Sequence, residues 1–255
     1  MVFPVVFIAL MLLGASLAGN WALAVYSLSF WHYYLYWLAY RYGAVPLAEF
    51  RRDAVALKSV SLLALGSVYL AFPLDWVSVA VVTGGFLLNA CAAKALGSAR
   101  TYYGHEAAGL PRLKITAFPY SWISHPMLVG NIAAFGGTLI NAGFRRYWWP
   151  LALAHVALNA GLLIMELLVT PLRRGIHPAP PSALSRGLLT GSLLASAGAA
   201  LGGAWTHAAH AGIPVALGAV LGACIGIYAV IIYLRYSPPT FGTASPGNTS
   251  STESL

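Results

Sequence analysis

Charged residues are scarce in this chain of 255 residues, and acidic residues are the scarcest. Only 8% of the residues are charged, with 14 basic residues against 6 acidic ones, whereas a soluble domain carries about 25%. Hydrophobic residues account for 59% of the chain, and its mean hydropathy is +0.75. This composition excludes a water-soluble globular enzyme and a disordered chain, and it predicts an integral membrane protein.

Cysteine is almost absent as well. Cys91 and Cys224 both fall in apolar runs, which excludes a disulfide-stabilised scaffold and is typical of small core residues. His207 and His210 have neither a carboxylate nor a cysteine beside them, and two histidines alone make a poor metal site. We therefore expect no bound metal.

The net charge of +8 comes from basic residues in short clusters between apolar runs. This pattern argues against nucleic-acid binding, which needs a broad basic surface, and it follows the positive-inside rule. One side of the predicted membrane carries Arg41, Arg51, Arg52, Arg100, Arg112, Lys114, Arg173, Arg174 and Arg235, and only Arg145 and Arg146 lie opposite. We predict that the basic side, with the loop of residues 99–127 and the C-terminal tail, faces the cytoplasm.

Apolar runs of membrane-spanning length predict an all-α transmembrane bundle of about seven or eight helices. Residues 1–40 are uncharged and form two helices with a break near Gly19 and Asn20, unless they contain a signal peptide or a surface helix in the aromatic run of residues 30–37. Further spans are predicted at residues 54–73, 76–97, 127–143, 148–170, 186–205 and 212–234. We expect a core of residues 1–176, an additional helix pair in residues 177–236 and a disordered tail of residues 237–255.

Polar residues concentrate in two places. The loop of residues 99–127 is the longest connection in the body of the chain, and long ordered loops are usually functional, although a solvated connector is the simpler interpretation. Glu166 lies inside a predicted span, near its end. A carboxylate in a membrane helix marks a candidate functional site, unless it is a structural, ion-paired residue at the interface.

Three sequence blocks carry a resemblance to a known family. Residues 95–104 (ALGSARTYYG), 114–120 (KITAFPY) and 125–130 (HPMLVG) are similar, in order and spacing, to blocks of the phosphatidylethanolamine N-methyltransferases. The similarity runs from Thr83 to Glu166, roughly a third of the chain. His125 and Pro126 also resemble the R-H-P motif of the related isoprenylcysteine carboxyl methyltransferases, with Ser124 in place of the arginine.

The resemblance implies S-adenosylmethionine as the methyl donor. Related enzymes bind it through a G-x-G sequence in one helix and a Glu-Glu pair in a later one. The corresponding positions here are Thr83, Gly84 and Gly85, and then Met165 and Glu166. Thr83 and Met165 depart from the pattern, and paired glycines in a membrane helix also serve helix packing.

The remaining polar residues suit methylation of an amine. An ethanolamine headgroup must lose a proton before its nitrogen can attack, and His125 or Glu106 could accept that proton. Tyr102, Tyr103 and Tyr120 could contact a cationic donor or headgroup through their ring faces. For His125 a helix cap or a core position is the alternative, and for the tyrosines it is interfacial packing.

The implied function is S-adenosylmethionine-dependent N-methylation of phosphatidylethanolamine, or of its mono- and dimethylated forms, towards phosphatidylcholine. The alternatives are a prenylcysteine carboxyl methyltransferase and a small membrane transporter, although no internal repeat favours the latter. The expected partners are the bilayer and a membrane lipid substrate, with homo-oligomerisation left open. In a eukaryotic cell the resemblance implies the endoplasmic reticulum membrane, with the active site facing the cytoplasm.

Overall fold

The computed structural model describes residues 2–17, 19–42, 47–102, 110–111 and 113–169. Its elements are α1 (Val2–Leu17), α2 (Trp21–Leu28), α3 (Trp31–Tyr42), α4 (Leu47–Tyr69), α5 (Trp76–Leu96), α6 (Ser98–Thr101), α8 (Pro126–Thr138) and α9 (Ala142–Val169). This part of the chain contains no strand, so the all-α prediction is confirmed for it. The predicted helix pair of residues 177–236 and the tail lie outside the described residues.

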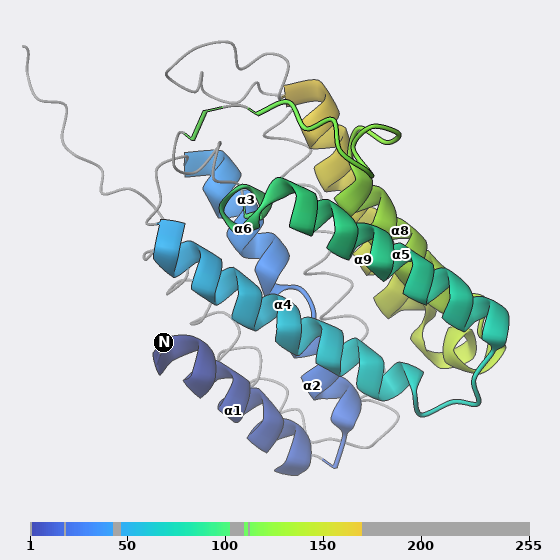
Figure 1. The fold of residues 1–255 in the computed structure, drawn as a ribbon. Coiled ribbons are helices and arrows are strands. Elements are labelled where there is room, and N and C mark those ends of the chain that lie inside the picture. The colour runs from blue at the N-terminus through green and yellow to red at the C-terminus, as the bar shows by residue number, and fades with distance from the viewer. Residues whose placement is uncertain (1, 18, 43–46, 103–109, 112, 170–255) are drawn as a thin grey trace, which may run out of the picture.

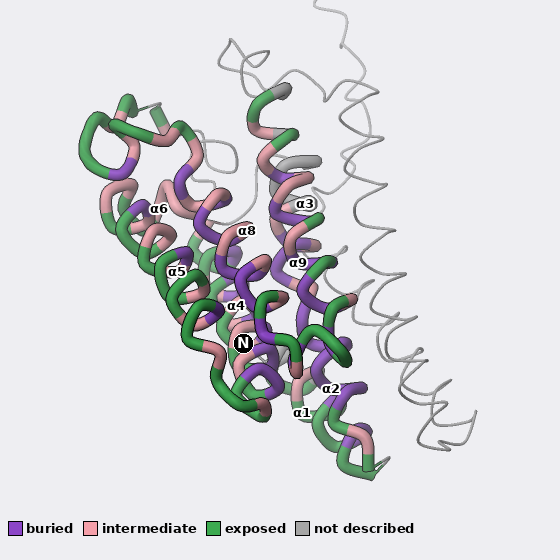
Figure 2. Tube along the Cα trace, turned by 90° about the vertical axis from the view of Figure 1, so that its right-hand side faces the viewer, coloured by how far each residue is buried: buried purple, intermediate pink, exposed green. Residues whose placement is uncertain are grey.

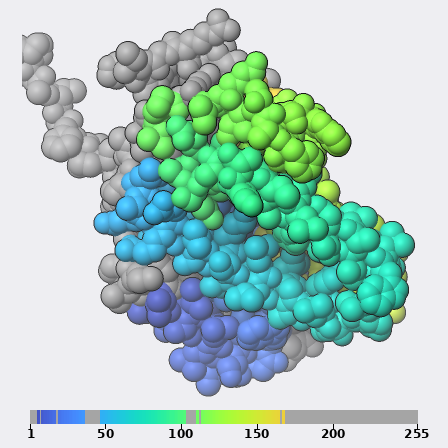
Figure 3. Space-filling model, in the orientation of Figure 1, coloured from blue at the N-terminus to red at the C-terminus, as the bar shows by residue number. Residues whose placement is uncertain are grey.

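Two of the described helical segments, Trp76–Leu96 and Ala142–Ile164, are long and apolar enough to cross a membrane, and Ile8–Leu17 is a shorter apolar helix. The surface of α5 agrees with a lipid-facing position. Its exposed side chains include Trp76 and Val77, and α5 crosses one open face of the molecule (teal in Figure 3). Together with the composition, these helices support a membrane protein.

The predicted break near Gly19 and Asn20 is confirmed. Gly19 has a φ of 62°, a conformation that favours glycine, and the Asn20 side chain accepts a hydrogen bond from the Ala22 N–H at the start of α2. A second break, between α2 and α3, is not predicted by the sequence. There Ser61 of α4 donates a hydrogen bond to the Ser29 carbonyl at 2.6 Å, and α2 is buried from Ala22 to Leu28 (purple in Figure 2).

The helices run between two ends of the bundle, α4 antiparallel to α5 and α8 antiparallel to α9 (Figure 1). At the end that we call the turn end, Asp75 caps α5, and Asn141 donates a hydrogen bond to the Pro73 carbonyl at 2.9 Å. At the opposite end, the loop end, Arg51 of α4 approaches Ser98 at 3.5 Å. Arg145, which follows Asn141, therefore lies at the turn end, on the other side from Arg51, as the charge pattern predicts.

Glycine allows α5 and α8 to pack with their backbones in contact. A Cβ atom at Gly85 would lie 2.5 Å from the Gly130 carbonyl oxygen and 2.6 Å from the Ala134 nitrogen. A Cβ atom at Gly130 would in turn lie 2.6 Å from the Gly85 carbonyl oxygen. The predicted span of residues 127–143 therefore packs closely against α5 through its glycine side.

Gly85→Ala is therefore expected to destabilise the fold by about 1–3 kcal/mol, because the obstructing atoms are backbone atoms and the two helices must separate. Thermal unfolding of the detergent-solubilised protein measures the effect. Gly84→Ala is the matched control, since a Cβ atom at Gly84 meets nothing within 4 Å. Equal melting of the two variants would show that the close approach does not stabilise the fold.

Two buried clusters set the position of the site. Toward the turn end, Tyr26 and Leu65 pack against Phe144, Trp148 and Leu151. A smaller cluster follows toward the loop end, where Tyr33 of α3 contacts the apolar side chains Leu128, Leu158 and Leu162 of α8 and α9. This second cluster ends at a cavity.

Candidate functional site

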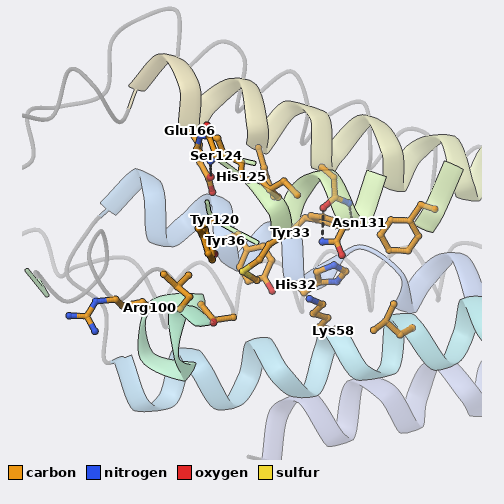
Figure 4. A pocket seen from close by; sticks show the side chains of 18 of the residues that line it. His32, Tyr33, Tyr36, Lys58, Arg100, Tyr120, Ser124, His125, Asn131 and Glu166 are labelled. Atoms are coloured by element: carbon orange, nitrogen blue, oxygen red, sulfur yellow. Dashed lines mark hydrogen bonds and ion pairs between the residues drawn. The ribbon is translucent and has the colours of Figure 1, made fainter. Parts of the chain in front are cut away.

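A cavity of about 370 Å³ opens among α3, α4, α8, α9 and the loop that precedes α8 (Figure 4). Its volume falls in the range of small-molecule sites. Its lining is mixed, with apolar side chains such as Leu128 and Leu162. The polar side chains that line it are His32, Tyr33, Tyr36, Lys58, Arg100, Thr101, Tyr120, Ser124, His125, Asn131, Asn159 and Glu166.

His125 and Glu166 form an ion pair or hydrogen bond in the cavity wall. His125 occupies the N-cap of α8, directly before Pro126, and Glu166 lies near the C-terminal end of α9. The His125 Nδ1 atom is 2.7 Å from the Glu166 Oε2 atom, and the side chains are 25% and 20% exposed. The His125 side chain does not cap the helix. With Nδ1 held by a carboxylate, Nε2 is the nitrogen left for a ligand.

Of the three predicted tyrosines, one lines the cavity, one does not, and one lies outside the described residues. Tyr120 lines the cavity, and burial, together with the nearby Glu166 carboxylate, raises the pKa of its phenol to about 12. Burial also raises the pKa of Tyr102, the C-cap residue of α6, which is not among the lining residues. Both phenols are therefore protonated at neutral pH. Tyr103 and Glu106 lie outside the described residues.

The predicted cofactor residues are not brought together. Thr83 and Gly84 are exposed on α5, and Gly85 is buried against α8. None of these three lines the cavity. Met165 belongs to α9, but its side chain is outside the described part of the structure. Of this predicted set, Glu166 is the residue that the structure places in the cavity.

A row of amide side chains crosses the bundle beside the cavity, and sequence reasoning did not single out most of it. Asn89 hydrogen-bonds Asn131, and Asn131 hydrogen-bonds Asn159, each at 3.0 Å. Asn159 then contacts the Tyr33 hydroxyl at 2.6 Å, and Tyr33 contacts Nδ1 of His155 at 3.1 Å. The signal in the sequence was an asparagine at each of three positions within apolar runs. Hydrogen bonds between helices allow such side chains to be buried in a membrane.

Lys58 is a second residue that sequence reasoning missed. It lies at the midpoint of α4 and lines the cavity. The signal was available, because Lys58 falls inside the predicted span of residues 54–73, where a charge is costly and marks a functional site by default.

Comparison with known proteins gives one family. The sequence model described as phospholipid methyltransferase matches residues 74–170, which comprise α5, α6, the loop, α8 and α9. Searches of curated proteins and of solved structures give no match. The match includes both members of the His125–Glu166 pair, whereas α1 to α4 lie outside it. Residues 74–170 thus match the phospholipid methyltransferase family, as the three sequence blocks indicate.

Proposed function

We propose that this protein transfers a methyl group from S-adenosylmethionine to the amine of phosphatidylethanolamine, or of its mono- or dimethylated forms. The observation that carries the proposal is the His125–Glu166 pair, 2.7 Å apart in the wall of a cavity and inside the region that matches the family. A histidine held by a carboxylate is a suitable proton acceptor for an amine nucleophile.

The cavity residues suit S-adenosylmethionine. Oε2 of Glu166 contacts His125, and Oε1 is left to hold the amino group of the methyl donor. The protonated phenol of Tyr120 can present its ring to a cation. The donor supplies a methyl group carried on a sulfonium ion. The resemblance alone supports four further proposed contacts with the methyl donor, at Thr83, Gly84, Gly85 and Met165.

His125 supplies what the acceptor needs. The headgroup arrives as an ammonium ion, and Nε2 of His125 takes its proton, while Glu166 orients the imidazole and stabilises its charged form. Tyr102, Tyr103 and Tyr120 are the proposed headgroup contacts, and Glu106 is the second candidate base. A prenylcysteine carboxylate is already ionised at neutral pH and needs no base, so the pair favours an amine acceptor over a carboxylate.

The proposal includes the placement of the protein. Seven or eight membrane helices would surround a site that opens to the cytoplasm, and in a eukaryotic cell the membrane would be that of the endoplasmic reticulum. The loop end carries Arg51 and Arg100, and basic residues favour the cytoplasmic side.

Cysteine labelling tests this orientation. In a background without Cys91 and Cys224, a cysteine at Ser121 in the loop, or at Ser245 in the tail, is expected to react from the cytoplasmic side only. A cysteine at Leu74, which is 47% exposed at the turn end, should react from the opposite side only. Labelling of Ser121→Cys from the external or lumenal face would reverse the topology.

Product identification tests the function itself. Purified protein in lipid nanodiscs receives S-adenosylmethionine with an isotopically labelled methyl group, together with phosphatidylethanolamine, its methylated forms and a prenylcysteine. Mass spectrometry is expected to find the label on the headgroup nitrogen. A variant lacking both His125 and Glu166 is the control. Label in a prenylcysteine ester would favour the alternative enzyme, and binding of no methyl donor at all would exclude both.

A further inference from the structure

Lys58 faces the cavity and has no carboxylate partner among the described residues. Its side chain extends from α4 toward His32 (Figure 4). Among the described residues, the ion pairs are those of Arg52 with Asp53 and of His125 with Glu166, and neither includes Lys58. A lysine in the middle of a membrane-protein helix is costly to keep charged unless an anion or a cavity accommodates it.

His32, beside Lys58, is also short of partners. It is 4% exposed, and its ring lies against that of Tyr33, with centroids 4.0 Å apart. Its Nδ1 atom is buried and has no hydrogen-bond partner in the described part of the chain. Within the described residues, a buried polar atom without a hydrogen-bond partner thus lies beside Lys58, which is unusual for a buried group.

The other side of the cavity carries the opposite charge. Glu166 projects from α9 across the cavity from α4, and Tyr33 and Tyr36 lie between the two sides (Figure 4). The described residues of the lining include two basic side chains, Lys58 and Arg100, and one carboxylate. That carboxylate already pairs with His125. A ligand that carries both a cationic and an anionic group would complement this separation of charge.

We propose that Lys58 binds an anionic oxygen group of the ligand, at the end of the cavity opposite Glu166. The proposal rests on the proposed function for the identity of the ligands, and it adds a residue outside the family-matched region. Two ligands carry such a group together with a cation. They are the phospholipid, through its phosphate, and the methyl donor, through the carboxylate of its amino-acid part, in which case the sulfonium ion and not the amino group would face Glu166.

Binding measurements with paired ligands test the proposal. Titration calorimetry on the detergent-solubilised protein compares short-chain phosphatidylethanolamine with an alkylamine that lacks the phosphate. It also compares S-adenosylmethionine with its decarboxylated form. The variants are Lys58→Gln and the charge-conserving Lys58→Arg, and Lys94→Gln is the matched control, because Lys94 is exposed on α5 and does not line the cavity.

Lys58→Gln is expected to weaken the binding of one of the two ligands that carry an anionic group by at least about tenfold. This is the usual cost of a lost hydrogen bond to a charged group. The corresponding ligand without the anion should bind as it does to the wild type, and Lys58→Arg should retain most of the affinity. If only the affinity for phosphatidylethanolamine falls, Lys58 binds the phosphate. If only the affinity for S-adenosylmethionine falls, Lys58 binds the carboxylate.

The proposal is overturned if Lys58→Gln binds all four ligands like the wild type. It is also overturned if the substitution weakens the binding of each ligand and of its anion-free counterpart equally. A wild-type protein that binds no methyl donor would instead refute the proposed function. The comparison of phosphatidylethanolamine with the alkylamine needs no methyl transfer, so it still decides the role of Lys58 in that case.

Discussion

His125→Ala is expected to lower the rate of methyl transfer to phosphatidylethanolamine by about 10²–10⁴-fold, the usual contribution of a positioned general base. Binding of S-adenosylmethionine should change little, because Glu166 keeps its carboxylate. The rate comes from single turnovers in nanodiscs, and the affinity from equilibrium binding.

His125→Asn provides the matched control, because it keeps a hydrogen-bonding side chain at this position. An asparagine can hydrogen-bond Glu166 but cannot take a proton. The variant should therefore be slow. A fully active variant would show that His125 only positions the loop, and Glu106 or water would then be the proton acceptor.

Glu166→Ala is expected to show the second large effect, on both donor affinity and turnover. Loss of the carboxylate should weaken the binding of S-adenosylmethionine by more than about tenfold, or about 1.4 kcal/mol. Loss of the contact at 2.7 Å frees the His125 ring, which should lower turnover by about another tenfold. Equilibrium binding and saturating single turnovers separate the two effects.

Glu166→Gln separates the charge from the orientation. A glutamine keeps a hydrogen-bonding side chain beside His125 but carries no charge for the donor's amino group, so affinity should fall more than turnover. Glu49→Ala, an exposed position at the start of α4, is the control. If Glu166→Ala folds and binds the donor normally, Glu166 is a structural residue and the donor binds elsewhere.

Helix positions were largely predictable because long apolar runs and turn residues are local signals. The sequence places the start of α5 at Trp76, after the capping Asp75, and the structure does the same. The break at Gly19 is likewise local. The break after Leu28 was missed, since it depends on a hydrogen bond from Ser61, 32 residues away.

The site was predictable residue by residue but not as an arrangement. His125 and Glu166 each carried a signal, yet their pairing joins positions 41 residues apart on two helices. Which face of a helix meets a cavity depends on its rotation in the bundle. That rotation turns Gly85 toward α8 and away from the cavity, and it turns Lys58 inward.

The amide row beside the cavity has a single direction of donation. Each amide nitrogen donates to the next oxygen, from Asn89 to Asn131, then to Asn159 and on to the Tyr33 hydroxyl. Tyr33, which accepts from Asn159, then contacts Nδ1 of His155 at 3.1 Å. The aligned dipoles reinforce one another. A histidine in α9 is therefore linked to an asparagine in α5 through three hydrogen-bonded side chains.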